Sequence, residues 1–386
     1  MNVSQYKGIN HGPITCIDVN SMYPGVMMND PLPYGMPVKI AEPDESRFPL
    51  WVVKAQFKLT VKPGVIPVYK FTQKADADME GIRTADSVTE CQCWHELTFT
   101  NVDIVNYSRF YDIRMKKGTA VYMGFQCAVG MFNEYIEYWY QVKKTAPKGS
   151  LERDDAKRMM NSCYGRFGLN PNMTDTGFVF NEKIDDTVSH EYPMVIDGHN
   201  AYLPIAMFVT AHARKRLCDV MLRVGCERVL HCDTDSCKFL GTPDMVGDLL
   251  SDTELGLWKD EGHPIVMIEG GVKRYIEFAA YPPRCMADIM AFTCAGMPQK
   301  STDDGVPVGM WVEVLDDPIL ICSDGYVFGQ EHYRIKSQWL RDLYIQHGMD
   351  PDDVDTMRAL KTNVKGGCIL IPTTFTLNDN MRSRMR

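Results

Sequence analysis

The chain contains 386 residues, of which 45% are hydrophobic and 24% are charged. This length and apolar content predict two or three globular units, which excludes a small disulfide scaffold and a disordered protein. The formal net charge of −9 argues against a protein that coats nucleic acid through bulk positive charge, so a site for a polyanion has to be a local basic groove.

The cysteines and the apolar runs narrow the class further. The 13 cysteines are an odd number and include no C-x-x-C pair, which favours reduced thiols in a cytosol. No apolar run reaches the roughly 18 residues that span a bilayer. We therefore expect a soluble protein without a membrane partner.

The first part of the chain contains strand and helix patterns. Residues 13–19 and 51–60 have strand patterns, and residues 21–28, which lie between them, have a helix pattern. Prolines and glycines at 31–37 predict a break in regular structure before the second strand. Residues 61–130 have the pattern of a mixed insert, with turn residues concentrated at 75–86.

The second part is mainly helical until about residue 225. Helical spacing at 131–140 and 151–164, joined by a loop, predicts a helical hairpin. Residues 171–195 predict a β-hairpin, 203–224 a long amphipathic helix and 228–240 two short strands around a tight turn. Beyond residue 300 the pattern weakens, with strands expected near 307–328 and a helix near 331–347.

Two aspartates interrupt the apolar strand pattern of Arg228 to Phe239. Asp233 and Asp235 are two residues apart, so they project to one side of an extended chain or line its turn. Two negative charges at this spacing suit a divalent cation. Taken alone, the pair fits an exposed hairpin tip equally well.

Asp18 strengthens the metal interpretation, because it ends another strand pattern. Three carboxylates on adjacent strands suit a two-ion Mg²⁺ site in which substrate phosphates complete the coordination. The reaction class that follows is in-line phosphoryl or nucleotidyl transfer.

A basic face is expected on the helix at 151–164. Residues spaced by about one or two turns share this face: Arg153, Lys157, Asn161 and Tyr164. The rise from Lys157 to Tyr164 is about 10 Å, enough to span a triphosphate and reach a sugar and base. An ordinary solvated basic face is the alternative, and the excess of basic residues at 141–170 weighs against it in an acidic chain.

Three motifs together resemble family B DNA polymerases. Residues 18–24, DVNSMYP, are similar to the D-x-x-S-L-Y-P motif A. Residues 157–165, KRMMNSCYG, are similar to the K-x-x-x-N-S-x-Y-G motif B, and residues 232–236, CDTDS, to the Y-x-D-T-D-S motif C. The motifs occur in the family's order.

Further matches resemble the protein-primed branch of tailed phages, linear plasmids and adenovirus-like genomes. They are YKG at 6–8 for the Y-x-G-G linker, TAHAR at 210–214 for T-x-x-A/G-R, KRY at 273–275 for K-x-Y, and TCAGM at 293–297 for a segment before the thumb. The resemblance implies an α+β right-hand fold with an antiparallel-sheet palm. Its expected parts are a palm at 1–30 and 196–296, inserts similar to the two terminal-protein regions at 31–130 and 171–195, helical fingers at 131–170, and a thumb and C-terminal region at 297–386.

The resemblance also implies a role for each matching residue. The expected catalytic carboxylates are Asp18, Asp233 and Asp235. The expected ligands of two Mg²⁺ ions are Asp18, Asp235 and the carbonyl of Val19, and Mn²⁺ is expected to substitute for Mg²⁺. The expected nucleotide contacts are Tyr23, Lys143, Lys144, Arg153, Lys157, Asn161 and Tyr164, with Tyr23 as the steric gate against a 2′-hydroxyl. The expected DNA contacts are Ser21, Gly165, Thr210, Arg214, Thr234, Lys273 and Tyr275.

The implied function is protein-primed, strand-displacing DNA-directed DNA synthesis in a host cytoplasm, with template-primer DNA, deoxynucleoside triphosphates and a terminal protein as partners. The few residues before Asp18 leave no room for the family's exonuclease domain, so we expect no 3′–5′ exonuclease and consider a separate exonuclease chain as a partner. Two alternatives remain: an RNA-templated or RNA-making palm enzyme, and a dependent or inactive DNA-binding subunit of a split replicase.

Overall fold

The computed structural model describes residues 2–4, 8–83, 86–169, 172–181, 186–195, 202–271, 273–280, 289–294, 324–327, 362–364, 367–369 and 376–378. Its contacts form two compact units. The first comprises residues 1–6, 12–169 and 200–264, and the second residues 7–11, 170–199 and 265–386. The helix expected at 331–347 lies outside the described residues, as does most of 307–328. The five predicted domain boundaries stay a prediction.

The first unit contains the antiparallel sheet that carries the aspartates. Its strand order is β1-β11-β12-β3-β13. The strands are β1 (Asn2–Ser4), β3 (Ile14–Val19), β11 (Val229–Asp233), β12 (Ser236–Leu240) and β13 (Trp258–Gly262). Apolar side chains such as Ile17 and Phe239 fix the register by burying one face. The strand predicted at 13–19 and the pair predicted at 228–240 are confirmed.

The second sheet of this unit has the order β4-β8-β5-β6, with β7 paired to β5. Its strands are β4 (Leu32–Ile40), β5 (Leu50–Val61), β6 (His95–Thr100), β7 (Tyr111–Met115) and β8 (Val121–Ala128). The predicted break at 31–37 is wrong, because β4 runs through it. β4 tolerates its prolines because it is an edge strand whose register shifts between Tyr34 and Val38.

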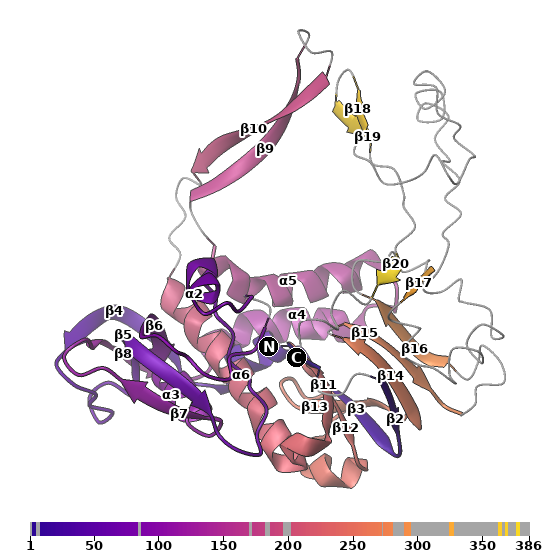
Figure 1. Ribbon diagram of the computed structural model, residues 1–386, viewed down its shortest axis with the longest axis horizontal. Coiled ribbons are helices and arrows are strands. Elements are labelled where there is room, and N and C mark those ends of the chain that lie inside the picture. Colours follow the sequence, from indigo (N-terminus) through magenta and orange to yellow (C-terminus); the bar gives the residue numbers. More distant parts are fainter. Residues whose placement is uncertain are drawn as a thin grey trace. The chain divides into compact units, whose positions relative to one another are not determined.

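The described part of this unit also contains six helices, of which α3 and α6 contact the sheets. They are α1 (Met22–Asn29), α2 (Lys74–Met79), α3 (Asn101–Tyr107), α4 (Asn133–Thr145), α5 (Leu151–Phe167) and α6 (Leu203–Val224), with 3₁₀ turns at Cys226–Arg228 and Pro243–Leu249. Figure 1 shows α4 and α5 side by side, which confirms the predicted helical hairpin. The turn-rich segment predicted at 75–86 instead begins with α2, whose Ala77 is buried. None of the described helices combines the length and apolarity needed to cross a membrane.

Helix α6 has the bounds that the sequence predicts, and it connects the two sheets. It contacts β11 and β12 of one sheet, and β4 and β6 of the other. Buried side chains such as Phe208, Leu217 and Met221 lie along its length, so the helix is nearly surrounded by protein. One hydrophobic core therefore extends through the first unit and holds the aspartate-bearing sheet in place.

The second unit has a four-stranded antiparallel sheet of order β16-β15-β14-β2. Its strands are β2 (Gly8–His11), β14 (Val266–Gly271), β15 (Arg274–Phe278) and β16 (Ile289–Cys294). The hairpin predicted at 171–195 is confirmed as β9 (Asn172–Asn181) paired with β10 (Asp186–Val195). Two short pairs complete the described part: β17 (Asp324–Val327) with β20 (Thr376–Asn378), and β18 (Thr362–Val364) with β19 (Gly367–Ile369).

Candidate active site

A row of polar side chains crosses four neighbouring strands of the aspartate-bearing sheet. Asp18 on β3 lies directly opposite Ser236 on β12, and Ser236 in turn lies opposite Asp233 on β11. On its other side Asp18 lies opposite Lys259 of β13. Residues directly opposite in an antiparallel pair project to the same face. Asp233, Ser236, Asp18 and Lys259 therefore form one row on one face.

Asp235 lies in the turn that joins β11 to β12, next to the end of β3. The backbone N–H of Val19 donates to the carbonyl oxygen of Asp235 at 2.8 Å. Within the turn, the Asp235 N–H donates to the carbonyl of Asp233 at 2.5 Å. Thr234 has a positive φ of 48°, a conformation that non-glycine residues rarely adopt. This tight turn brings the motif C aspartates to the end of the motif A strand.

Asp18 lies in a crowded carboxylate environment. Burial raises the pKa of Asp18 to about 7, and the negative charges of Asp235 and Glu261 contribute to the increase. Lys259 and Lys157 act in the opposite direction without cancelling it. A carboxyl group in this environment is stabilised in its charged form by an additional cation.

The carboxylate donors fit a divalent ion that shares its coordination with substrate. Among the described residues, no three Asp, Glu, His or Cys side chains are gathered into a self-contained metal site. Mg²⁺ is typically held by one or two carboxylates together with substrate phosphates and water. The oxygen atoms of Asp18 and Asp235 meet that requirement.

The turn after β3 places Ser21 and Tyr23 at the same end of the sheet. Ser21 has a positive φ of 50° and its carbonyl accepts from the N–H of Gly25 at 2.9 Å. A Cβ on Gly25 would lie 2.3 Å from the Cα of Gly256, so only glycine permits this close backbone approach. The start of α1 is thereby fixed against the chain that leads into β13.

The two aromatic residues of motifs A and B lie together. The ring centroids of Tyr23 and Tyr164 are 4.0 Å apart, with 30° between their planes. Burial raises the pKa of the Tyr23 phenol, and its hydrogen bond with Tyr164 adds to the increase. The structure thus brings together two residues that the sequence places far apart.

The basic face of the helical hairpin also points toward motif A. Lys143 on α4 donates from Nζ to the hydroxyl of Ser21 at 3.3 Å. Burial lowers the pKa of Lys143, and the charges of Lys157 and Arg153 lower it further. Lys157 also acts on Asp18. The cations of α4 and α5 are therefore close to one another and to Asp18.

Arg153 has partners that the sequence analysis did not anticipate. Its guanidinium donates to the carbonyls of Lys143 and Ala146 at the C-terminal end of α4. Those carbonyls lack partners within the helix, so Arg153 caps α4.

On α5, Lys157 and Asn161 are exposed, Gly165 is half-buried, and Lys144 on α4 is exposed.

Thr210 and Arg214, the two DNA contacts expected in the TAHAR segment, form hydrogen bonds within the protein. Thr210 donates from its hydroxyl to the carbonyls of Ala206 and Met207, in its own helix. Arg214 donates from Nε and Nη2 to one carboxylate oxygen of Asp103, at 3.0 and 2.7 Å. Burial alone lowers the pKa of Arg214, but Asp103 reverses the effect and the net pKa is raised.

The ion pair between Arg214 and Asp103 is expected to contribute to the free energy of unfolding. The Asp103 side chain is 5% exposed, and Asp103→Asn would leave the half-buried guanidinium of Arg214 without its charged partner. We expect the free energy of unfolding to fall by about 2 kcal/mol. Denaturant unfolding measures this, with Asp112→Asn on β7 as an exposed control expected to stay within about 0.5 kcal/mol. Equal stability of Asp103→Asn and wild type would contradict the assignment.

Lys273 and Tyr275 lie in the second unit. Lys273 is exposed at the turn between β14 and β15 and has a positive φ of 58°. Tyr275 lies opposite Glu269 on one side and Thr293 on the other. Lys273 thus lies in the turn of the β14–β15 hairpin, and Tyr275 lies on β15, the second strand of that hairpin.

Two residues of β13 belong to the site but were missed in the sequence. Lys259 lies opposite Asp18, and Glu261 is the extra residue where the register shifts between Asp260 and Gly262. Lys259 and Glu261 form an ion pair beside Asp18. The run of charged residues after Trp258 was the signal in the sequence that could have identified them. Only the sheet pairing shows that this run lies next to β3 and therefore beside Asp18.

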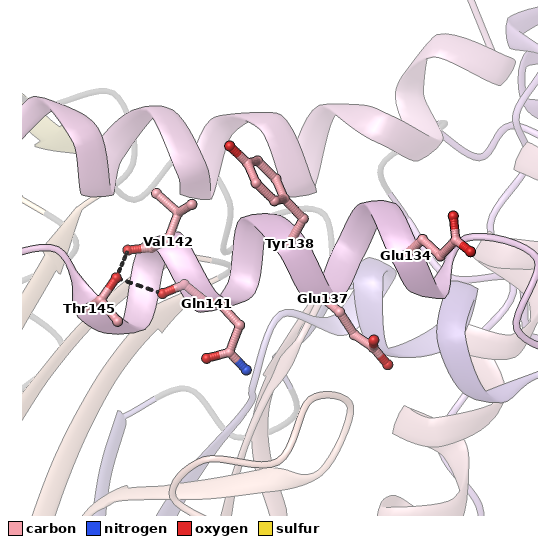
Figure 2. Close-up of a pocket in the computed structure, with 6 residues that line it drawn as sticks. All are labelled: Glu134, Glu137, Tyr138, Gln141, Val142 and Thr145. Carbon is pink, nitrogen blue, oxygen red and sulfur yellow. Dashed lines mark hydrogen bonds between the residues drawn. The ribbon is translucent and has the colours of Figure 1, made fainter.

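A shallow hollow lies on α4 outside this site. Figure 2 shows its lining, all from one helix: Glu134, Glu137, Tyr138, Gln141, Val142 and Thr145. The hydroxyl of Thr145 donates to the carbonyls of Gln141 and Val142 at 2.9 and 3.3 Å. Because the lining carries two carboxylates and no cation, it does not suit a nucleotide phosphate.

The antiparallel sheet carries paired aspartates, and the cations of α4 and α5 lie close to them, which is the arrangement expected of the polymerase class. The chain belongs to the type B DNA polymerases of organelles and viruses, whose family model matches residues 2–236. The resemblance to the protein-primed branch of family B is likewise confirmed.

Individual relatives agree with this membership. The DNA polymerase of Streptococcus phage Cp-1 is 32% identical over 279 residues, which is 68% of this chain and 46% of that protein. The DNA polymerase of Bacillus phage Nf is 31% identical over 266 residues, which is 67% of this chain and 44% of that protein. The chain thus matches less than half the length of these relatives.

Solved structures confirm the fold. Phi29 DNA polymerase, in a complex with primer-template DNA and incoming nucleotide substrates, superposes with a TM-score of 0.71 and 22% sequence identity. The match covers 97% of this chain and 61% of that chain. The predicted α+β polymerase fold with antiparallel sheets is therefore confirmed, while the predicted inserts and thumb stay predictions.

Proposed function

We propose that the chain is a DNA-directed DNA polymerase that adds deoxynucleotides to a primer 3′-hydroxyl under the direction of a template. The observation that carries this proposal is the row of Asp233, Ser236, Asp18 and Lys259, with the cations of α4 and α5 close to Asp18. Family membership and the names of the relatives support it. Phi29 DNA polymerase forms its complex with primer-template DNA and nucleotide, and we propose the same two partners for this chain.

The proposed metal ligands are Asp18, Asp235 and the carbonyl of Val19, with Asp233 beside them. Two Mg²⁺ or Mn²⁺ ions bound there would activate the primer hydroxyl and stabilise the charge of the transferring phosphate. The protein's own contribution is to hold Asp18 at the end of β3 beside Asp235 in the turn between β11 and β12, where the Val19 N–H fixes the position of the Asp235 backbone. Glu261 and Lys259 adjust the charge around Asp18.

The raised pKa of Asp18 predicts a pH dependence of metal binding. Without metal, Asp18 is about half protonated near pH 7, because its folded pKa is raised from an ordinary value near 4. A divalent ion has to displace that proton, so we expect Mg²⁺ affinity to fall about tenfold per pH unit below pH 7 and to level off above it. Isothermal titration calorimetry at pH 6, 7 and 8 measures this. An affinity that is equal at all three pH values would contradict it.

The proposed nucleotide site lies between motif A and the helical hairpin. Lys143, Lys144 and Lys157 would neutralise the triphosphate, and Arg153 would act on it by fixing the end of α4 that carries Lys143. Tyr23 and Tyr164 would frame the sugar and base, with Tyr23 as the gate against a 2′-hydroxyl. Asn161 and Gly165 would line the new base pair.

The proposed DNA contacts are distributed over both units. Ser21 and Thr234 would contact template or primer near the carboxylates, and Lys273 and Tyr275 would hold the primer end. Thr210 and Arg214 face a competing demand, because the Thr210 hydroxyl and Nε and Nη2 of Arg214 already donate to partners inside the protein. Their contribution to DNA binding would therefore act through the position of α6 more than through direct contact.

We also propose protein-primed initiation and strand displacement, in a host cytoplasm. The β9–β10 hairpin is the element proposed to favour strand displacement. Deletion of residues 173–192 is expected to leave extension of a short primer intact and to shorten products on long duplex templates. Gel analysis of both reactions measures this, and unchanged product length on the long template would contradict the role of the hairpin.

Primer extension beside DNA-binding measurements tests the proposed function against a DNA-binding subunit of a split replicase. We expect extension of a labelled primer with Mg²⁺ and four deoxynucleotides, with each added base set by the template. Fluorescence anisotropy measures binding of the same DNA. Binding without extension in either Mg²⁺ or Mn²⁺ would favour the subunit, and ribonucleotide incorporation as efficient as deoxynucleotide incorporation would favour an RNA-making enzyme.

A further inference from the structure

Tyr23 lies in the first turn of a short helix that ends at Asp30. Helix α1 covers Met22–Asn29, and the N–H of Asp30 donates to the carbonyl of Val26 at 3.0 Å, which closes the last turn. From Tyr23 to Asp30 the helix rises about 10 Å. Because two hydrogen-bonded turns move together as one piece, the position of Asp30 influences the position of the Tyr23 ring.

Helix α6 binds this end of α1 through two side chains that lie one turn apart. The guanidinium of Arg216 donates from Nη2 to Oδ2 of Asp30 at 2.7 Å. The Nε2 of His212 donates to the carbonyl of Pro31 at 3.1 Å, and its Nδ1 lies 3.5 Å from Oδ1 of Asp30. Residues four apart on a helix share a face, so both side chains reach the same target. Both carboxylate oxygens of Asp30 therefore lie next to side chains of α6.

The guanidinium of Arg216 also reaches the segment that packs against the start of α1. A Cβ on Gly256 would lie 3.4 Å from Nη1 of Arg216 and 3.1 Å from the Cα of Gly25. The N–H of Gly256 donates to the carbonyl of Asn20 at 2.8 Å, just before α1 begins. Arg216 thus lies between Asp30 at the end of α1 and Gly256, which contacts its first turn.

Stability alone does not account for an arginine at this position. The Arg216 side chain is 20% exposed, and burial lowers its pKa against the opposing charges of Asp30 and Asp219. Its Nη1 is buried and has no hydrogen-bond partner among the described residues. An unpaired buried donor destabilises the folded state, and a largely buried ion pair offsets little of that cost. What a hydrogen-bonded ion pair adds is a defined geometry between the two helices.

We infer that Arg216 is a positioning residue for the proposed nucleotide site: its ion pair with Asp30 fixes α1 on α6 and so holds the Tyr23 ring where it rejects a ribonucleotide. This inference rests on the proposed function, in which Tyr23 is the gate against a 2′-hydroxyl. It assigns a part in sugar selection to a residue outside motifs A, B and C.

The inference predicts a change in sugar selection that a loss of stability would not cause. A steric gate discriminates through a clash, and a ring that can move away relieves the clash. Arg216→Gln should therefore raise kcat/KM for a ribonucleotide about tenfold relative to kcat/KM for the matching deoxynucleotide. Partial unfolding would lower the two values equally and leave their ratio unchanged. Steady-state kinetics on one primer-template measures this ratio.

Two further variants test whether the ion pair is responsible. Asp30→Ala removes the partner carboxylate and should change the ratio as much as Arg216→Gln does, with no further change in the double variant. The matched control is Arg223→Gln, the same substitution in an arginine of α6 that pairs with Asp248. Its ratio should stay within about twofold of wild type. An unchanged ratio in Arg216→Gln, or additive effects in the double variant, would overturn the inference.

Hydrogen–deuterium exchange of the full chain, without DNA or nucleotide, provides a second test that is independent of polymerase activity. Exchange of the backbone N–H groups of α1 reports how often the helix opens. We expect peptides that cover residues 20–31 to exchange at least about threefold faster in Arg216→Gln and Asp30→Ala, and as in wild type in Arg223→Gln. Unchanged exchange in the first two variants would overturn the inference, whereas failure of the wild type to extend a primer would overturn only the proposed function.

Discussion

Asp235→Asn is expected to reduce nucleotide incorporation by at least about a thousandfold. The substitution keeps the size of the side chain and the backbone contact from the Val19 N–H to the Asp235 carbonyl, and removes only the negative charge. Because Asp18 and Asp235 are the two proposed carboxylate ligands, an amide at 235 leaves one charged ligand. Single-turnover incorporation with saturating Mg²⁺ measures the effect.

The control for this variant is Asp78→Asn on α2. Asp78 is exposed, so the same change of charge should leave incorporation within about twofold of wild type. Asp235→Asn should also retain primer-template binding, since the affinity for DNA comes mainly from cations. Incorporation by Asp235→Asn at more than a tenth of the wild-type rate would contradict the proposed role of Asp235.

Lys157→Ala is expected to lower kcat/KM for nucleotide incorporation by about 10- to 100-fold. Lys157 is exposed on α5 and its charge acts on both Lys143 and Asp18, so it lies where the triphosphate is proposed to bind. The loss corresponds to one charge-assisted contact, about 1.5–3 kcal/mol. Steady-state kinetics with varied nucleotide concentration measures the change.

The neighbouring residue supplies a matched control for Lys157. Arg158 is also exposed and basic, but it is paired with Asp155 in its own helix. Arg158→Ala should leave kcat/KM within about twofold of wild type. Equal losses in the two variants would show that the general charge of α5, not the position of Lys157, supports nucleotide binding.

Local pattern predicted the elements that carry the site. Helix α6 begins and ends at the expected residues, and the turn between β11 and β12 lies where two aspartates interrupt an apolar run. Both features are encoded within short stretches, by apolar spacing and by turn residues. Asp18, Tyr23 and Lys157 lie within motifs. In the structure the charge of Lys157 acts on Asp18, and the ring of Tyr23 lies against that of Tyr164.

The remaining parts of the site depend on pairing between distant segments. Glu261 lies beside Asp18 only because β13 pairs with β3 across a register shift. Arg214 finds its carboxylate in α3, more than a hundred residues away in the chain. β4 contains prolines that locally predict a break, yet as an edge strand it needs fewer backbone donors. Long-range pairing of this kind leaves no mark on the pattern of either segment.

Counting bound Mn²⁺ ions tests the central claim most directly, that Asp18, Asp235 and an incoming nucleotide together form a two-metal site. The measurement uses the full chain with a primer that ends in a dideoxynucleotide, its template and the next complementary nucleotide. We expect two Mn²⁺ ions per chain by electron paramagnetic resonance, and loss of both in the double variant Asp18→Asn, Asp235→Asn. A wild-type complex that holds no Mn²⁺, or the same number as the double variant, would contradict the account.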